Sequence, residues 1–293
     1  MDKLRDIIFT HSDLDGMSSY LTLCWILKSK PNVVTTTPTT INETLNIWLK
    51  SNKFEDYRTV YFLDLDTTNA ADIIDVANVV IIDHHISNTH KYKNAKVAIK
   101  EYSSCSKLLK DLLGKDVKFT DPQKLLIALA DDFDSHSKKT EVSYDLNVIF
   151  HNTNDKIASF VANFYKGFNG FDKFQKNLIN IYKSNRDEHI NSIENIYEGV
   201  LSIKEKKYKV LATFSNDYVQ DVCDHLLTKY PCDIVFLVMP KRGKVCIRKQ
   251  KDCDLDLSNL ASKLCNGGGH KEAAGGVITE AFEMFSKTLK PVI

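Results

Sequence analysis

Carboxylate and imidazole side chains follow three short apolar runs of this 293-residue chain. They are His11, Asp13 and Asp15 after the first run, Asp64 and Asp66 after the second, and Asp83, His84 and His85 after the third. One such segment alone would be explained by a solvated turn, because turns favour aspartate. Three segments that each abut an apolar run favour a shared metal site instead. Carboxylates gathered in one place repel one another unless cations neutralise them.

Two divalent ions a few ångströms apart would neutralise such a cluster, and paired ions of this kind catalyse in-line attack at phosphorus. Asp13 and Asp15 stand two residues apart, so one can serve each ion, and a carboxylate such as Asp64 can bridge both. Asp66 could replace Asp64, but Asp64 follows its apolar run directly and is preferred. Mixed Asp and His ligation favours Mn²⁺, with Mg²⁺, Co²⁺ and Zn²⁺ as further options.

A second group of chemically interesting residues lies near the C-terminus. Gly267, Gly268 and Gly269 can bring backbone N–H groups close to an anion, and His270 adds a polar side chain to the same loop. Arg248, on a predicted strand, offers bidentate recognition of phosphate. A flexible turn and a solvated arginine explain the same residues equally well, so the residues alone leave this choice open.

The elements expected around the first cluster alternate between strand and helix. β-branched apolar runs predict strands, and apolar residues at helical spacing predict helices. The expected strands are 7–10, a run from 33, 60–63, 77–82 and 96–99, and the expected helices are 17–28, 41–50, 70–76, 103–113 and one starting at 121–122. This order predicts an α/β fold with a doubly wound, mainly parallel sheet. Because ligands bind at the carboxyl ends of the strands in such sheets, the three acidic segments should converge.

The chain is long enough for two domains. Residues 1–150 are expected to form the metal-binding domain, 151–200 a helical connector and 201–293 a smaller α/β domain. The active site is expected in the cleft between the two domains. The oligomeric state is open, with a homodimer as one option.

Composition favours a cytoplasmic protein. Lys and Arg number 39 and Asp and Glu 38, so the net charge of +1 makes no case for long duplex DNA as the partner. No apolar run approaches the length that spans a bilayer, and no signal peptide is visible. The seven cysteines include no CxxC pair and fit a reducing compartment, with most thiols buried as small hydrophobes.

The motifs resemble, in order and separation, those of the DHH phosphoesterases. The resemblance rests on His11-x-Asp13-x-Asp15-Gly16, the Asp after a strand, Asp83-His84-His85 and a later Asp. The run Gly267-Gly268-Gly269-His270-Lys271-x-Ala273-Ala274-Gly275 is similar to the glycine-rich GGGH signature of the DHHA1 domain. Together these motifs span almost the whole chain.

The resemblance implies a role for each polar residue. One ion would be held by His11, Asp13 and Asp64, and the other by Asp15, Asp64, His84 and an Asp of the 131–134 cluster. In that cluster Asp131 follows the helix most directly and Asp134 precedes a serine, so both are retained, with Asp132 as a competitor. His85 would lie close to the scissile phosphate, and Asp83 would orient its neighbours.

The activity that the resemblance implies is metal-dependent hydrolysis of phosphodiester bonds. Near-neutral charge and compact length favour a short substrate, so we expect cleavage of short single-stranded RNA to nucleoside 5′-monophosphates with two Mn²⁺ ions. Arg248 and the loop of Gly267–His270 would grip that substrate. The alternatives are a cyclic or linear dinucleotide phosphodiesterase and a RecJ-like single-strand DNA exonuclease. A non-catalytic nucleotide sensor is the alternative of another class, and the complete metal set argues against it.

Overall fold

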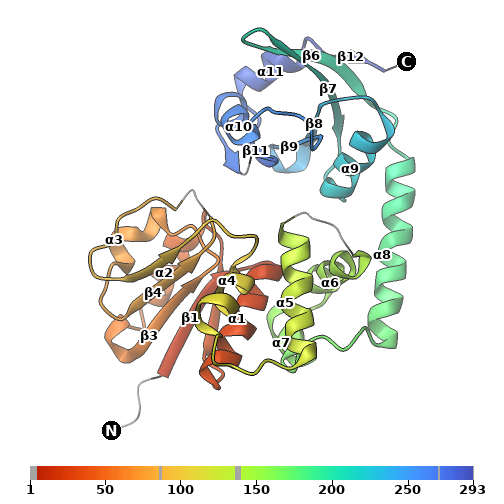
Figure 1. The fold of residues 1–293 in the computed structure, drawn as a ribbon. Coiled ribbons are helices and arrows are strands. Elements are labelled where there is room, and N and C mark those ends of the chain that lie inside the picture. The colour runs from red at the N-terminus through yellow and green to blue at the C-terminus, as the bar shows by residue number, and fades with distance from the viewer. Residues whose placement is uncertain (1–4, 86–87, 136–139, 270, 293) are drawn as a thin grey trace. The chain divides into compact units, whose positions relative to one another are not determined.

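The computed structural model describes residues 5–85, 88–135, 140–269 and 271–292. The chain divides into an N-terminal unit, Met1–Ile179, and a C-terminal unit, Asn180–Ile293 (Figure 1). The division falls inside helix α8 (Lys173–Asn191), within the stretch 151–200 for which the sequence predicts a helical connector. Within the described ranges, no helix combines the length and apolarity needed to cross a membrane.

The N-terminal unit is built on a five-stranded parallel sheet with the order β2-β1-β3-β4-β5. Its elements are β1 (Arg5–His11), α1 (Leu14–Leu27), β2 (Asn32–Thr36), α2 (Ile41–Trp48), η1 (Phe54–Asp56), β3 (Tyr57–Leu63), η2 (Thr68–Ala70), α3 (Ala71–Ile74), β4 (Val79–Asp83), β5 (Lys96–Ile99), α4 (Cys105–Leu113), α5 (Asp121–Asp134), α6 (Glu141–Asn152) and α7 (Lys156–Phe164). This topology confirms the predicted doubly wound α/β fold.

Both faces of this sheet are covered (Figure 1). On one face Phe9 of β1 stacks on Phe62 of β3, with ring centroids 4.9 Å apart, and both belong to a core that includes Ile41 and Leu45 of α2. The other face carries α1, in which every residue from Leu14 to Trp25 is buried. Strands covered on both sides read as nearly continuous apolar runs, which explains why the sequence revealed them.

The C-terminal unit contains a seven-stranded mixed sheet with the order β10-β11-β9-β8-β7-β6-β12, in which β7 and β8 are parallel. Its elements are β6 (Tyr197–Ile203), β7 (Lys206–Phe214), α9 (Val219–Lys229), β8 (Ile234–Met239), η3 (Pro240–Arg242), β9 (Lys244–Lys249), α10 (Leu257–Cys265), β10 (Gly268–Gly269), β11 (Ala273–Val277), α11 (Glu280–Ser286) and β12 (Lys290–Pro291). This arrangement confirms the predicted smaller α/β domain.

Strand β8 organises this second unit, because all six of its residues are buried. Phe236 packs into one core with residues of α10 and α11, and Leu237 packs into another with residues of α9. Successive side chains of a strand point to opposite faces, so one apolar run supports two layers. All seven cysteines are unbridged and buried, as the sequence indicated.

Candidate metal centre

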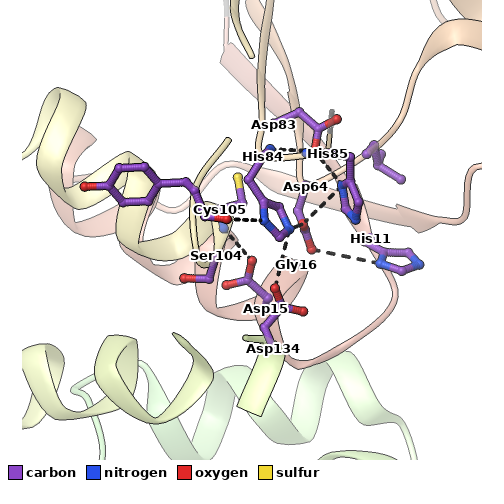
Figure 2. A network of polar contacts seen from close by, with 12 residues as sticks. His11, Asp15, Gly16, Asp64, Asp83, His84, His85, Ser104, Cys105 and Asp134 are labelled. Atoms are coloured by element: carbon purple, nitrogen blue, oxygen red, sulfur yellow. Dashed lines mark hydrogen bonds and ion pairs between the residues drawn. The ribbon is translucent and has the colours of Figure 1, made fainter. Parts of the chain in front are cut away.

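Strands β1, β3 and β4 end level with one another, since Thr10 pairs with Leu63 and Leu63 with Ile82. The acidic segments that follow these strands come together as three groups whose candidate ligand atoms lie within 4.8 Å of one another. We name two of them the His11 group (His11, Asp13, Asp64) and the His84 group (Asp15, His84, Asp134); the third joins Asp64 to His84 and His85. Figure 2 shows the members His11, Asp15, Asp64, His84, His85 and Asp134 around the end of the sheet.

Asp64 lies at the centre of the arrangement. It is 1% exposed, its Oδ1 lies 3.2 Å from His84 Nε2, and its Oδ2 lies 3.9 Å from His11 Nδ1. Burial raises the pKa of Asp64 well above its ordinary value, and the nearby carboxylates of Asp15 and Asp13 raise it further. Its backbone is left-handed (φ 56°), a conformation that costs most L-residues roughly 1–2 kcal/mol. Strained backbone of this kind is typical of functional sites.

His84 is oriented by the backbone. Its Nδ1 lies 3.2 Å from the Tyr102 carbonyl oxygen, which can only accept a hydrogen bond, so Nδ1 carries the proton. Nε2 then presents a lone pair, 3.2 Å from Asp64 Oδ1 and 3.4 Å from Asp134 Oδ2. This is how a metal-binding histidine is held in the tautomer that ligates.

Three buried atoms of this centre have no hydrogen-bond partner in the described part of the chain: Asp64 Oδ1, Asp64 Oδ2 and His84 Nε2. Buried polar atoms are nearly always satisfied, so each exception requires an explanation. Two carboxylate oxygens and an imidazole lone pair, all acceptors that face one another, fit a divalent cation. The residues present therefore suit a divalent metal ion.

Asp13 and Gly16 fix the backbone at the start of helix α1. Asp13 caps the helix, with its Oδ1 accepting from the Gly16 N–H (2.9 Å), and its Oδ2 lies 2.6 Å from His11 Nδ1. Burial acts to raise the pKa of Asp13, but the contacts with His11 and Gly16 outweigh it and the pKa is lowered. A Cβ on Gly16 would lie 2.3 Å from the His11 carbonyl oxygen, so only glycine fits there.

Asp15 is held from helix α4, far along the sequence. Its Oδ2 accepts from the Cys105 N–H (2.6 Å) and its Oδ1 from the Ser106 N–H (3.1 Å). These are free N–H groups of the first helical turn, where anions are stabilised. Burial nevertheless dominates and raises the pKa of Asp15, although the nearby imidazole of His84 acts to lower it.

The three aspartates that end helix α5 have separate environments. Asp134 belongs to the His84 group, and burial together with Asp15 and Asp13 raises its pKa to about 8. Asp131 accepts from Ser103 and Ser104 and pairs with Lys107, so the structure does not bring it to the candidate metal centre. Asp132 accepts from the Thr140 N–H and the Ser143 hydroxyl, which joins α5 to α6. Asp66, the alternative to Asp64, accepts from the Thr68 N–H in a turn.

His85 and Asp83 form a contact beside the ligands. Asp83 Oδ1 lies 2.7 Å from His85 Nδ1 and also accepts from the N–H groups of His84 and His85. Burial acts to lower the pKa of His85, but the hydrogen bond with Asp83 and the charges of Asp83, Asp134 and Asp13 raise it overall. This geometry agrees with an orienting role for Asp83.

Asn88 is a site residue that the sequence analysis did not single out. It is 4% exposed, and its amide nitrogen donates to Asp83 Oδ2 (3.2 Å), Thr67 Oγ1 (3.2 Å) and the Leu65 carbonyl (3.3 Å). It thereby ties the segment after β3 to the segment after β4. Its position five residues after Asp83, in a polar turn, was the available signal.

The glycine-rich segment of the C-terminal unit is more ordered than the expected loop. The Gly267 N–H donates to the Ala261 carbonyl, and Gly268 and Gly269 form β10, paired with β11. A Cβ on Gly267 would lie 1.9 Å from the Gly275 carbonyl oxygen, so close packing requires this glycine. Arg248 pairs with Ala273 across β9 and β11, while His270 lies outside the described residues.

The sequence matches two family models. Residues 6–131 match the N-terminal domain of the DHH family, and residues 205–293 match the DHHA1 domain. No match was found among curated proteins.

Solved structures with this fold cover 97% of the chain at low identity. A structure described as a DHH domain from a family of ribosomal proteins has a TM-score of 0.67 at 15% identity, with 86% of that chain covered. The pGpG-specific phosphodiesterase PggH of Vibrio cholerae has a TM-score of 0.59 at 14% identity, with 96% of that chain covered. RecJ of Thermus thermophilus with Mn²⁺ has a TM-score of 0.60 at 14% identity, with 51% of that chain covered. With both domains matched in order, the chain belongs to the DHH/DHHA1 phosphoesterase family.

Proposed function

We propose that this protein is a two-metal phosphodiesterase that cleaves short single-stranded oligoribonucleotides to nucleoside 5′-monophosphates. The observation that carries the proposal is the set of buried acceptor atoms on Asp64 and His84 that have no hydrogen-bond partner among the described residues. Family membership supports the reaction class, and the candidate ligand groups around Asp64 support the proposal of two divalent ions. Mixed carboxylate and imidazole ligation makes Mn²⁺ the preferred ion.

Each ligand group would hold one ion, with Asp64 shared between them. When bound, such ions act as Lewis acids on the phosphate and lower the pKa of the attacking water. The chain itself contributes placement: Gly16 fixes Asp13, the Tyr102 carbonyl fixes His84, and the start of α4 fixes Asp15. Ligands fixed in this way need little rearrangement during the reaction.

His85 is proposed to act on the substrate phosphate. Asp83 accepts from its Nδ1, so the Nε2 edge of the ring is the one that can donate to a phosphate or leaving oxygen. The raised pKa of His85 favours the protonated ring, because the contact with Asp83 outweighs the effect of burial. A positioned general acid of this kind contributes about 100- to 10,000-fold to a rate.

The C-terminal unit is proposed to bind the rest of the substrate. Arg248 offers a guanidinium for phosphate, and Gly268, where an added Cβ would find one atom of the described residues at 4.0 Å, leaves room for a close approach. Gly267 is assigned to packing, since its N–H is bonded within the unit. His270 is retained as a proposed contact from the sequence motif.

A dinucleotide is the second candidate substrate. The chain and PggH, which is named as a pGpG-specific phosphodiesterase, cover one another almost completely, at 97% and 96%. A net charge of +1 also supports a substrate with few phosphates, because long polyanions require many cationic contacts. A single-stranded DNA substrate, suggested by the likeness in fold to RecJ, is the third candidate.

The deciding experiment is a hydrolysis panel in Mn²⁺ with an EDTA control. The panel contains an RNA dinucleotide, an RNA pentamer, a cyclic dinucleotide and a single-stranded DNA 20-mer. Fast, EDTA-sensitive release of nucleoside monophosphates from both short RNAs supports the proposal. Preference for either dinucleotide or for DNA changes the substrate and retains the centre. Nucleotide binding without cleavage would replace the proposal with a sensor.

A further inference from the structure

Asp131, which the sequence offered as a metal ligand, is tied to the segment that begins helix α4. Its Oδ1 accepts hydrogen bonds from Ser103 Oγ (2.5 Å) and Ser104 Oγ (2.9 Å), and its Oδ2 lies 3.0 Å from Lys107 Nζ. Lys107 Nζ also donates to Ser103 Oγ (3.0 Å), which closes the network. Three donors of one short segment thus converge on a single carboxylate.

The same segment holds two ligands of the His84 group. The Tyr102 carbonyl accepts from His84 Nδ1 (3.2 Å), and the N–H groups of Cys105 and Ser106 donate to Asp15 (2.6 and 3.1 Å). All three holding atoms belong to the backbone. Their positions therefore depend on where the whole segment lies, and the contacts of the adjacent serines with α5 help to set that position.

The other side of the network carries the third ligand of the group. Asp131 lies on α5 three residues before Asp134, and residues three apart share one face of a helix. A contact that fixes Asp131 against the start of α4 also fixes Asp134 relative to the backbone that binds Asp15. One carboxylate thereby links the supports of all three ligands.

We propose that Asp131 and Lys107 form a positioning pair that sets the geometry of the His84 group and not that of the His11 group. This inference rests on the proposed two-metal centre. Side-chain exposure is 19% for Asp131 and 40% for Lys107, and ion pairs in contact with solvent contribute little energy by themselves. The pair acts by placing the segment and helix that carry the ligands. The His11 group depends on other contacts, those of Asp13 with His11 and Gly16.

The test is a calorimetric titration of the metal-free full chain with Mn²⁺. Three variants are compared with the wild type: Asp131→Asn, Lys107→Met and the double variant. Asp131→Asn preserves side-chain shape and removes the charge that pairs with Lys107. Lys107→Met changes only the partner, which is half-exposed and contacts no ligand of the centre in the described structure, so it reports on the network without touching a candidate ligand.

Two reference variants assign the binding events. Asp134→Asn identifies the event that belongs to the His84 group, and His11→Gln identifies the other. Asp121→Asn is the matched control, because Asp121 is also on α5 and also pairs with a lysine, at 3.0 Å, but lies at the opposite end of the helix. The control should leave both events unchanged.

We expect each single variant to weaken the event of the His84 group about 10- to 100-fold, the usual effect of removing a support of a ligand. The other event should be unchanged, and the double variant should bind no more weakly than the worse single variant, since the pair acts as a unit. Loss of affinity in Asp131→Asn but not in Lys107→Met would make Asp131 a ligand and overturn the inference. Equal loss of both events would show a merely structural role and overturn it too.

The outcomes also separate this inference from the proposed function. Wild-type protein that binds two Mn²⁺ ions, with unchanged binding in every variant of the pair, contradicts the inference alone. Wild-type protein that binds two ions and cleaves no phosphodiester contradicts the proposed function alone. If circular dichroism shows that Asp131→Asn does not fold, Lys107→Met, at a half-exposed side chain, decides whether the pair positions the His84 group.

Discussion

The His11 group contains Asp64 and the His84 group contacts it through His84, but the two groups are otherwise held in different ways. His11 and Asp13 have side chains 26% and 33% exposed and are fixed mainly by contact with one another and with α1. In the His84 group the His84 side chain is 6% exposed, and backbone atoms of a separate segment hold two of its three ligands, His84 and Asp15. A ligand held by buried backbone has little freedom to compensate for a change, whereas a half-exposed one can be replaced by water. The two groups should therefore respond differently to the same kind of substitution.

The largest effect is expected at Asp64, which lies between the two groups. Asp64→Asn retains size and tolerance for a left-handed backbone but removes the charge that faces both groups. We expect kcat to fall by about three orders of magnitude or more, because several kcal/mol of charge stabilisation is lost. Calorimetry should show both Mn²⁺ binding events weakened. A variant that loses only one event would show that Asp64 does not bridge.

The comparison itself is tested by matched changes in the two groups. His84→Gln, at a side chain that is 6% exposed, should lower kcat about 100-fold or more, and His11→Gln, at a side chain that is 26% exposed, should lower it about tenfold, since water can complete a partly exposed coordination position. Initial rates on an RNA dinucleotide at saturating Mn²⁺ measure both. Equal losses would mean that exposure does not distinguish the groups.

The pH dependence of stability should be reversed by metal. The pKa values of Asp15, Asp64 and Asp134 are raised in the folded chain, that of Asp134 from 3.8 to about 8. The folded state therefore binds protons more tightly than the unfolded state, and its stability is lost as pH rises from about 4 through about 8. The raised pKa of His85 acts in the same direction.

Thermal unfolding in EDTA at pH 5, 6.5 and 8 measures how the stability of the folded state changes with pH. In EDTA we expect the midpoint temperature of unfolding to decrease as the pH increases. With Mn²⁺ it should stay level or increase over the same range, because metal binding displaces protons. Asp134→Asn should flatten the slope in EDTA. A midpoint in EDTA that rises across this range would contradict the assignment of a metal-dependent acidic cluster.

A smaller effect is expected from substitution of Asn88, which contacts Asp83, the residue that in turn holds His85. Asn88→Ala removes the amide that joins Asp83 to the segment after Asp64. We expect kcat to fall about tenfold with Mn²⁺ affinity nearly unchanged, because the substitution disturbs a residue one contact away from the ligands. Asn42→Ala, which removes an exposed side-chain contact elsewhere in the same unit, is the control. A change in affinity larger than the change in kcat would place Asn88 in support of a ligand instead.

The strand ends of the N-terminal unit could be predicted because two physical rules act together there. Parallel strands covered on both faces give apolar runs, and the polar residues directly after them must lie at one edge. That reasoning selected Asp64 over Asp66, and the family resemblance retained Asp134 beside Asp131; the structure brings Asp64 and Asp134 to the candidate centre. Sequence reasoning could not choose Asp134 over Asp131, because the two lie one turn apart on the same helix and the choice depends on which turn meets the ligands and which meets Ser103, Ser104 and Lys107.

The C-terminal unit was harder to predict for a different reason. Glycine signals backbone freedom, but sequence does not distinguish a loop open to ligand from a strand packed without space for a Cβ. Gly267 is packed without space for a Cβ, and its N–H donates to the Ala261 carbonyl. Strand β6 was also missed, because its residues alternate between half-buried and exposed and resemble the polar helical stretch before it.

The candidate ligands all lie between residues 11 and 134, within the N-terminal unit. During synthesis the ribosome therefore delivers these candidate ligands before residues 135–293 are made. Domains generally fold as units, the N-terminal one first. Once α5, α6 and α7 have emerged and packed, the nascent chain could take up the proposed metal ions before the C-terminal unit is synthesised. Metal binding would then come first, and synthesis of the unit that is proposed to bind substrate would follow.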